Sequence, residues 1–234
     1  MIRRRFSIIQ CNCFIRLICN FGILFSTKLI IMKTLFFLLA ISFSNTLLWG
    51  QIKLKDRAPL SDKLMVSANT ESLSLIKAMK KNGLVVIFSC NTCPFVVGSE
   101  SFPGWEGQYN DLYEQANKYQ IGLVVVNSNE GKRMGDDSFI EMKNHAETKA
   151  YNMPYLMDEN SVLANAFGAK TTPHVYFFNE KLSLIYMGSI DNIWDKNRTQ
   201  TIPYLMNAML AKNQGNRIKI KNTTPKGCSI KRTK

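Results

Sequence analysis

The sequence of 234 residues predicts a single α/β domain built on a mixed β-sheet, and three observations support this prediction. Strand-like and helix-like segments alternate after residue 65. Two strand segments, 84–89 and 121–126, are continuously apolar, which is typical of parallel strands buried on both faces. Two later segments, 174–178 and 182–187, flank a polar turn and predict an antiparallel hairpin. The sheet should be parallel in its first half and closed by this hairpin.

Helices are predicted from apolar residues at helical spacing and from capping residues. The first helix should be capped at Asn69 or Thr70 and stopped by Gly83. Asp136, Asp137 and Ser138 favour the start of a later helix, both as caps and as charges at the positive end of the helix dipole. The other predicted helices cover about 105–119, 161–167 and 202–210. No second domain is predicted.

The net charge of +13, from 30 basic and 17 acidic residues, first suggests a protein that binds nucleic acid or a membrane surface. Six of the basic residues lie in 1–50, which contains no acidic residue. No predicted helix of the remaining chain has a basic stripe interleaved with aromatic residues, so no nucleic-acid partner is predicted. With 46% apolar and 20% charged residues, the chain can bury a core and is not a disordered protein.

Residues 1–50 are predicted to be a leader that precedes the domain. The apolar run 34–49 follows Met32-Lys33, so residues 32–50 resemble a signal peptide, with an uncleaved membrane anchor as the alternative. Residues 1–31 then belong to a mis-assigned start. The leader predicts export to a periplasmic or other extracytoplasmic compartment, where thiols tend to be oxidised. The globular domain should span 51–212, and the basic tail 213–234 should be flexible.

Cys90-Asn91-Thr92-Cys93 directly follows the buried strand 84–89, where a helix should begin. Amides at a helix start lower the pKa of a thiol, and a two-residue gap lets the two sulfurs open and close a disulfide. A redox pair is therefore predicted, against the alternatives of a static disulfide or a zinc site. A closed zinc site needs four ligands, and besides the pair this part of the chain offers only Cys228, His145 and His174. No metal and no cofactor are predicted.

The element order and two motifs, FSCNTCP and TTPHVYFF, resemble the thioredoxin fold and, more closely, the redoxin family related to the AhpC/TSA peroxiredoxins. The resemblance covers about 55–212. It implies a cis peptide bond at Thr172-Pro173 that packs against the cysteine pair, with backbone hydrogen bonds from Thr172 to a substrate. It also implies a thiol–disulfide oxidoreductase that acts on protein thiols and disulfides and works with a redox partner.

In this scheme Cys90, expected to be the more exposed sulfur, attacks a partner disulfide and Cys93 resolves the mixed disulfide. The buried aspartate that thioredoxins place six residues before the first cysteine is Leu84 here. Two other functions remain open. One is peroxide reduction, with Cys228 in the tail as an extra resolving thiol. The other is copper binding by Cys90, Cys93 and His174, since thiolates and imidazole suit copper.

Overall fold

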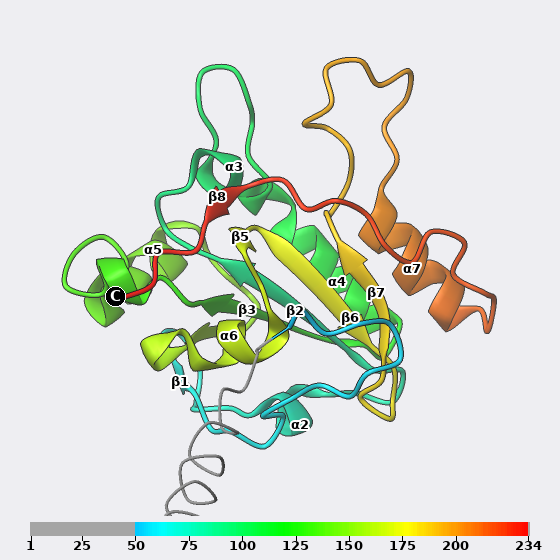
Figure 1. Ribbon diagram of the computed structural model, residues 1–234, viewed down its shortest axis with the longest axis horizontal. Coiled ribbons are helices and arrows are strands. Elements are labelled where there is room, and N and C mark those ends of the chain that lie inside the picture. Colours follow the sequence, from blue (N-terminus) through cyan, green and yellow to red (C-terminus); the bar gives the residue numbers. More distant parts are fainter. Residues whose placement is uncertain (1–49, 234) are drawn as a thin grey trace, which may run out of the picture. The chain divides into compact units, whose positions relative to one another are not determined.

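Six strands form the central sheet of the protein, which we describe from a computed structural model covering residues 50–233 (Figure 1). Their order is β1-β4-β3-β2-β6-β7. Strands β2, β3 and β4 are parallel, whereas β1, β6 and β7 each run antiparallel to their neighbours. The strands are β1 (Val66–Ser67), β2 (Leu84–Ser89), β3 (Gly122–Asn127), β4 (Tyr155–Met157), β6 (His174–Phe178) and β7 (Leu184–Gly188). The predicted mixed sheet with its closing hairpin is confirmed.

Alternate side chains of the central strands enter two separate cores. In β2, Val85 and Ile87 pack on one face with Trp105 and Tyr109, and the neighbouring side chains of the strand pack on the other face. Every residue of β2 and β3 is buried. This is why both strands are continuously apolar: each must bury both of its faces.

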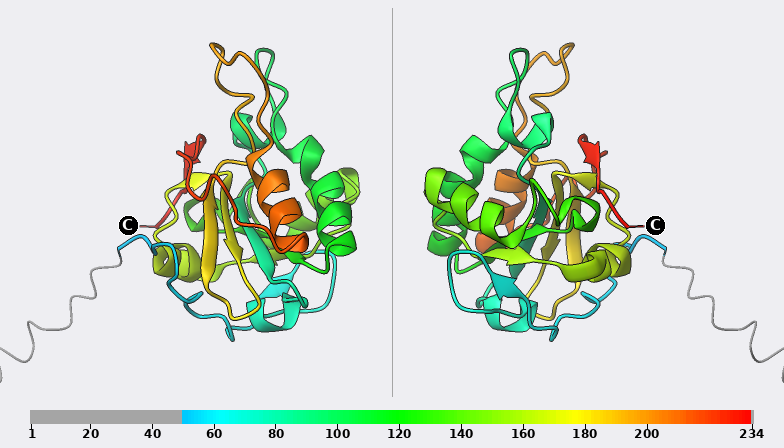
Figure 2. Two further views of the ribbon diagram at one scale, coloured as in Figure 1. Left: turned by 90° about the vertical axis from the view of Figure 1, so that its right-hand side faces the viewer. Right: turned by 90° about the vertical axis from the view of Figure 1, so that its left-hand side faces the viewer.

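Helices cover both faces of the sheet (Figure 2). The core on one face is completed by α4 (Tyr109–Lys118), α5 (Phe139–Thr148) and α7 (Tyr204–Asn213). The core on the other face is completed by α2 (Leu75–Ala78) and α6 (Val162–Phe167). The remaining short helices are α3 (Pro94–Val97), η2 (Glu106–Gln108), η3 (Glu130–Lys132) and η4 (Glu159–Ser161). None of the helices in residues 50–233 has the length and apolar character needed to cross a bilayer.

The first predicted helix is much shorter than expected. It is capped by the hydroxyl of Ser74, not by Asn69 or Thr70, and Ile76 is 45% exposed. Asn69 accepts a hydrogen bond from the amide of Tyr155 instead, and so ties the entry segment to β4. The short strands β1 and β4 were not predicted, since two or three residues give no measurable alternation.

The prediction of a flexible tail is corrected by the structure. Residues 217–233 run beside β7 and then across β5 (Thr171–Thr172), where β8 (Cys228–Ser229) pairs antiparallel with it (Figure 1). The amide of Met187 donates to the carbonyl of Lys221, and Ile230 is buried. The backbone hydrogen bonds of the tail, which composition does not reveal, explain the difference. The predicted leader, 1–50, lies outside the described residues except for Gly50.

Gly122, the first residue of β3, gives a direct test of the packing between β3 and α2. A Cβ atom at this position would lie 2.0 Å from the carbonyl oxygen of Ala78. We expect Gly122→Ala to lower the free energy of unfolding by about 3 kcal/mol, since backbone must move to admit the methyl group. Urea denaturation measures the change. Gly107→Ala is the matched control, because no atom lies within 4 Å of its added Cβ.

Candidate active site

The cysteine pair lies where the central strand β2 gives way to α3. Cys90 directly follows β2, and Cys93 is the residue that precedes α3. Both cysteines are free and nearly inaccessible, with exposed fractions of 2% for Cys90 and 4% for Cys93. The expectation that Cys90 is the more exposed sulfur is therefore wrong. Helix α3 is a single turn, since Gly98 at its end has a φ of 96° that other residues rarely adopt.

Asn91, between the two cysteines, is held by hydrogen bonds on every polar group of its side chain. Its Nδ2 donates to the carbonyl of Asp136 at 2.8 Å, and its Oδ1 accepts from the hydroxyl of Tyr155 at 2.7 Å. Its backbone amide donates to the buried carboxylate of Asp137 at 2.9 Å. The loop that carries the sulfurs is thus fixed by polar groups beneath it.

The predicted proline turn packs directly against the pair. The Thr172-Pro173 peptide bond is cis, as the resemblance implies. The hydroxyl of Thr172 lies 3.2 Å from Sγ of Cys90, and its carbonyl oxygen lies 3.2 Å from Sγ of Cys93. Four residues predicted for the site, Cys90, Cys93, Thr172 and Pro173, therefore come together.

Cys228 joins this cluster from the C-terminal segment. Its amide lies 3.3 Å from Sγ of Cys93, although the two residues are 135 positions apart. Its side chain packs against the cluster formed by Cys90, Cys93 and Val96 and remains partly exposed. The tail thus brings a third thiol to the pair.

The negative charge of the reduced cluster is favoured on Cys93. The pKa of Cys93 is lowered to about 5, first by a hydrogen bond from the Cys90 thiol and further by hydrogen bonds from Cys228, which outweigh the opposing effect of burial. The pKa of Cys90 is raised far above its ordinary value, because its thiol hydrogen-bonds to Cys93 and because it is buried. Burial and the neighbouring Cys93 raise the pKa of Cys228 to about 11. The thiolate is therefore favoured at Cys93 and not at Cys90, the sulfur to which the sequence assigned the first attack.

The redoxin family model matches residues 53–202. The chain belongs to the redoxin family. An uncharacterized conserved protein from Geobacillus kaustophilus is 28% identical, with a TM-score of 0.66 over 79% of this chain and 94% of that chain. A hypothetical protein from Sinorhizobium meliloti 1021 is 24% identical, with a TM-score of 0.68 over 79% of this chain and 97% of that chain. No curated protein matches the sequence at a significant level. The predicted family and its thioredoxin-like fold are confirmed.

His174 of this redoxin does not extend the cysteine cluster into a metal site. It is buried in β6 with Nδ1 3.3 Å from the hydroxyl of Tyr176, and burial lowers its pKa to about 3. Within residues 50–233, no three side chains from histidine, cysteine, aspartate and glutamate come together as metal ligands. The copper set of Cys90, Cys93 and His174, kept open from sequence, is not assembled in this part of the chain.

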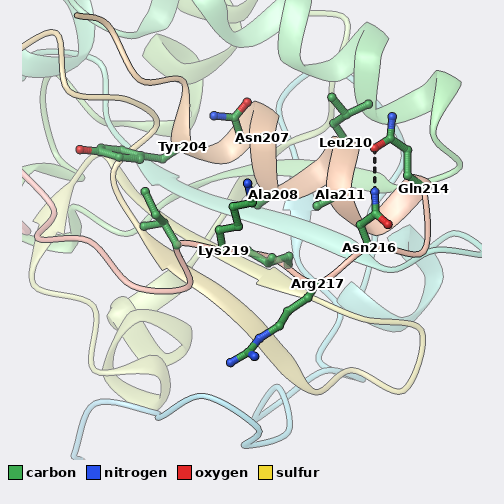
Figure 3. A pocket seen from close by; sticks show the side chains of 11 residues that line it. Tyr204, Asn207, Ala208, Leu210, Ala211, Gln214, Asn216, Arg217 and Lys219 are labelled. Carbon is green, nitrogen blue, oxygen red and sulfur yellow. Dashed lines mark hydrogen bonds between the residues drawn. The ribbon is translucent and has the colours of Figure 1, made fainter.

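Several hollows lie on the surface formed by residues 50–233 of the redoxin. A groove of about 500 Å³ borders the cysteine loop, and its lining includes Pro94, Phe95, Phe102 and Trp194. A second hollow, of about 450 Å³, lies between α7 and residues 214–220, where Asn216 hydrogen-bonds to Gln214 (Figure 3). Its lining includes no cysteine and no residue of β5. Of these two hollows, only the first groove borders the cysteine loop.

The polar support of the cysteine loop was missed by sequence reasoning, which took Asp137 for a helix-start residue. Ser138 is the actual cap of α5, and Asp137 points instead beneath Asn91. The polar run 127–129 at the end of β3 is the sequence signal that could have revealed this support. The end of a strand that pairs with β2 lies beside the redox loop. Asn127 and Asn129 from this run both donate to the carboxylate of Asp137.

Replacing Asp137 should destabilise the redoxin strongly. Asp137→Ala leaves the buried Asn91 amide and the side-chain amide of Asn129 without an acceptor, and Asn127 keeps only its hydrogen bond to the Tyr155 hydroxyl. We expect a loss of about 3 kcal/mol in the free energy of unfolding, measured by urea denaturation of the reduced protein. The neighbouring Asp136→Ala is the control and should cost no more than about 0.5 kcal/mol, because its side chain is 56% exposed. Equal losses for both variants would contradict the supporting role of Asp137.

Proposed function

We propose that this redoxin is a thiol–disulfide oxidoreductase that exchanges disulfides with protein partners through Cys93 and Cys90. One observation carries the proposal: Sγ of Cys93, favoured as the thiolate, accepts a hydrogen bond from the Cys228 amide and lies within hydrogen-bonding reach of a Cys90 that keeps its proton. A thiolate is the attacking form of cysteine, and a neighbouring protonated thiol is suited to resolve the product. Membership of the redoxin family is consistent with this chemistry.

The exchange begins with attack of the Cys93 thiolate on a disulfide of the partner. A bond forms between Sγ of Cys93 and one partner sulfur, and the other partner sulfur leaves as a thiolate. Cys90 then attacks Cys93, and its proton goes to the sulfur that departs. The partner is reduced by two electrons, and a Cys90–Cys93 disulfide remains. A thiol reductant must return this pair to the dithiol form.

The buried environment of Cys90 supports its role in the second step. Because its pKa is raised, Cys90 stays protonated and cannot compete with Cys93 for the first attack. In the mixed disulfide Cys93 carries no charge, so the hydrogen bond that holds the Cys90 proton is lost. The Thr172 hydroxyl, 3.2 Å away, lowers the pKa of Cys90 and favours its ionisation at that stage.

Insulin reduction in the presence of dithiothreitol tests the proposed function. The full chain should accelerate the precipitation of reduced insulin chains above the rate with dithiothreitol alone. Hydrogen-peroxide consumption, measured in parallel, should not exceed that of a Cys93→Ser variant. Peroxide turnover without insulin reduction would replace the proposal by the peroxide-reductase alternative. The proposed export depends on residues 1–50 and stays a prediction.

A further inference from the structure

The C-terminal segment occupies an edge that an extended partner would need. In the antiparallel pairing of β8 with β5, Cys228 lies opposite Thr172 and Ser229 lies opposite Thr171. Addition of a strand to a free sheet edge is a common way for proteins to bind an extended peptide. Gly227 permits the close approach, because a Cβ there would lie 2.1 Å from the Thr172 carbonyl oxygen. The tail therefore binds this edge as a peptide from another protein would.

Contacts on both sides of Cys228 fix its position over the pair. Before it, the ammonium of Lys226 lies 4.5 Å from the ring centroid of Trp194. After it, the amide of Ile230 donates to the carbonyl of Lys170 at 3.0 Å, and Arg232 donates to the carbonyl of Ala169. A thiol held in this way reacts at a high effective concentration with the sulfur it faces.

Of the three cysteines that the structure describes, only Cys228 is partly exposed. A disulfide closed between Cys90 and Cys93 would expose little of either sulfur, so a thiol reductant would reach Cys228 more readily than the pair. Cys228 faces Cys93 on one side and solvent on the other, so it can connect the two environments. Burial and the neighbouring Cys93 raise the pKa of Cys228, and the part due to Cys93 is removed when Cys93 enters a disulfide.

We propose that Cys228 is a third redox thiol, which takes the disulfide from the buried pair and presents it to the reductant at the surface. Sγ of Cys228 attacks Sγ of Cys93 in the Cys90–Cys93 disulfide. The Cys93–Cys228 bond forms, the Cys90–Cys93 bond breaks, and Cys90 leaves and takes up the proton that Cys228 gave up. The protein remains oxidised by two electrons in this step. The inference rests on the proposed function, which supplies the oxidised pair.

A trapping experiment on the full chain tests whether this bond forms. Reduced Cys90→Ser protein is mixed with insulin as the oxidant, quenched with acid, alkylated and digested with trypsin. Trypsin places Cys228 in the peptide 227–231 and Cys93 in the peptide 82–118. We expect mass spectrometry to find these two peptides joined by a disulfide. Peptide mapping distinguishes this bond from any formed by Cys11, Cys13 and Cys19.

A double variant provides the matched control for position. Cys228→Ser combined with Ser229→Cys keeps one thiol in β8 but turns it to the opposite face of the strand. In the Cys90→Ser background this variant should accumulate an insulin adduct at Cys93 and no internal bond. If the control formed an internal disulfide to Cys93 in equal yield, the proposal would be overturned, because the position of Cys228 in β8 would then not matter. Absence of the Cys93–Cys228 bond from Cys90→Ser would overturn it as well.

Recycling kinetics provide the functional measurement. We expect reduced glutathione to reduce the oxidised Cys228→Ser protein at least tenfold more slowly than the oxidised wild-type protein. Equal rates would refute a shuttle through Cys228. The two proposals fail in different ways. Wild-type protein that does not reduce insulin contradicts the proposed function, whereas active wild-type protein with no effect of Cys228→Ser contradicts the third thiol alone.

Discussion

Replacing Cys93 with serine should lower insulin reduction by at least about 100-fold, because it removes the only thiol of the cluster that is favoured as a thiolate. Cys90→Ser combined with Cys228→Ser should also stop turnover, because no resolving thiol remains in the cluster, but it should leave the first attack intact. The two variants therefore separate the attacking sulfur from the resolving sulfur, which the loss of activity alone does not.

The assignment is measured most clearly in a Cys228→Ser background, where no third thiol can resolve an adduct. There, Cys90→Ser should accumulate a mixed disulfide between Cys93 and insulin, visible on a non-reducing gel and by peptide mapping. Cys93→Ser should accumulate none at Cys90. The opposite pattern would restore the assignment made from sequence, with Cys90 as nucleophile. Circular dichroism of each variant checks that serine leaves the fold unchanged.

The parts of the site that sequence could predict are those fixed by local order along the chain. Cys90 and Cys93 were found because they follow a strand whose apolar run is unmistakable, and that strand lies at the centre of the sheet. Pro173 was assigned to the site because the TTPHVYFF motif, with a proline at the entry of an apolar strand, resembles the thioredoxin fold. Both signals depend on strong burial of neighbouring residues, which leaves a clear pattern.

The roles of the two sulfurs could not be predicted in the same way. The charge on Cys93 depends on contacts across the fold, such as the hydrogen bond donated by the Cys228 amide from 135 residues away. Position in the motif favoured Cys90, because the earlier cysteine was expected to be the more exposed. Here both are buried, and hydrogen bonds decide which sulfur holds the charge.

The course of the tail was hidden for a related reason. Its residues have no apolar periodicity, so composition favoured a solvated segment. What holds them is backbone pairing with β5 and with the edge of β7, together with two buried side chains, Ile218 and Ile230. Backbone hydrogen bonds depend little on side-chain type, and a two-residue strand therefore leaves almost no trace in a sequence.

The pH dependence of alkylation offers the sharpest measure of where the thiolate lies. With a pKa of about 5, Cys93 should be more than about 90% thiolate at pH 6, whereas an ordinary cysteine with a pKa of about 8.5 is about 0.3% thiolate. Between pH 6 and pH 8.5 the iodoacetamide rate of Cys93 should stay nearly constant. An ordinary cysteine should accelerate by about 150-fold over the same range.

The direction of the change follows from the lowered pKa. A thiol whose pKa is depressed is fully ionised above that value, so the Cys93 rate falls only as the pH drops through about 5. The lower basicity of such a thiolate reduces its intrinsic reactivity by about 40-fold. Because Cys93 is also only 4% exposed, the diagnostic is the flat pH profile and not the absolute rate. Mass spectrometry of the labelled peptides, with Cys93→Ser as control, assigns the rate to one sulfur. A flat pH profile at Cys90 with a rising one at Cys93 would contradict this charge distribution, because the thiolate would then reside on Cys90.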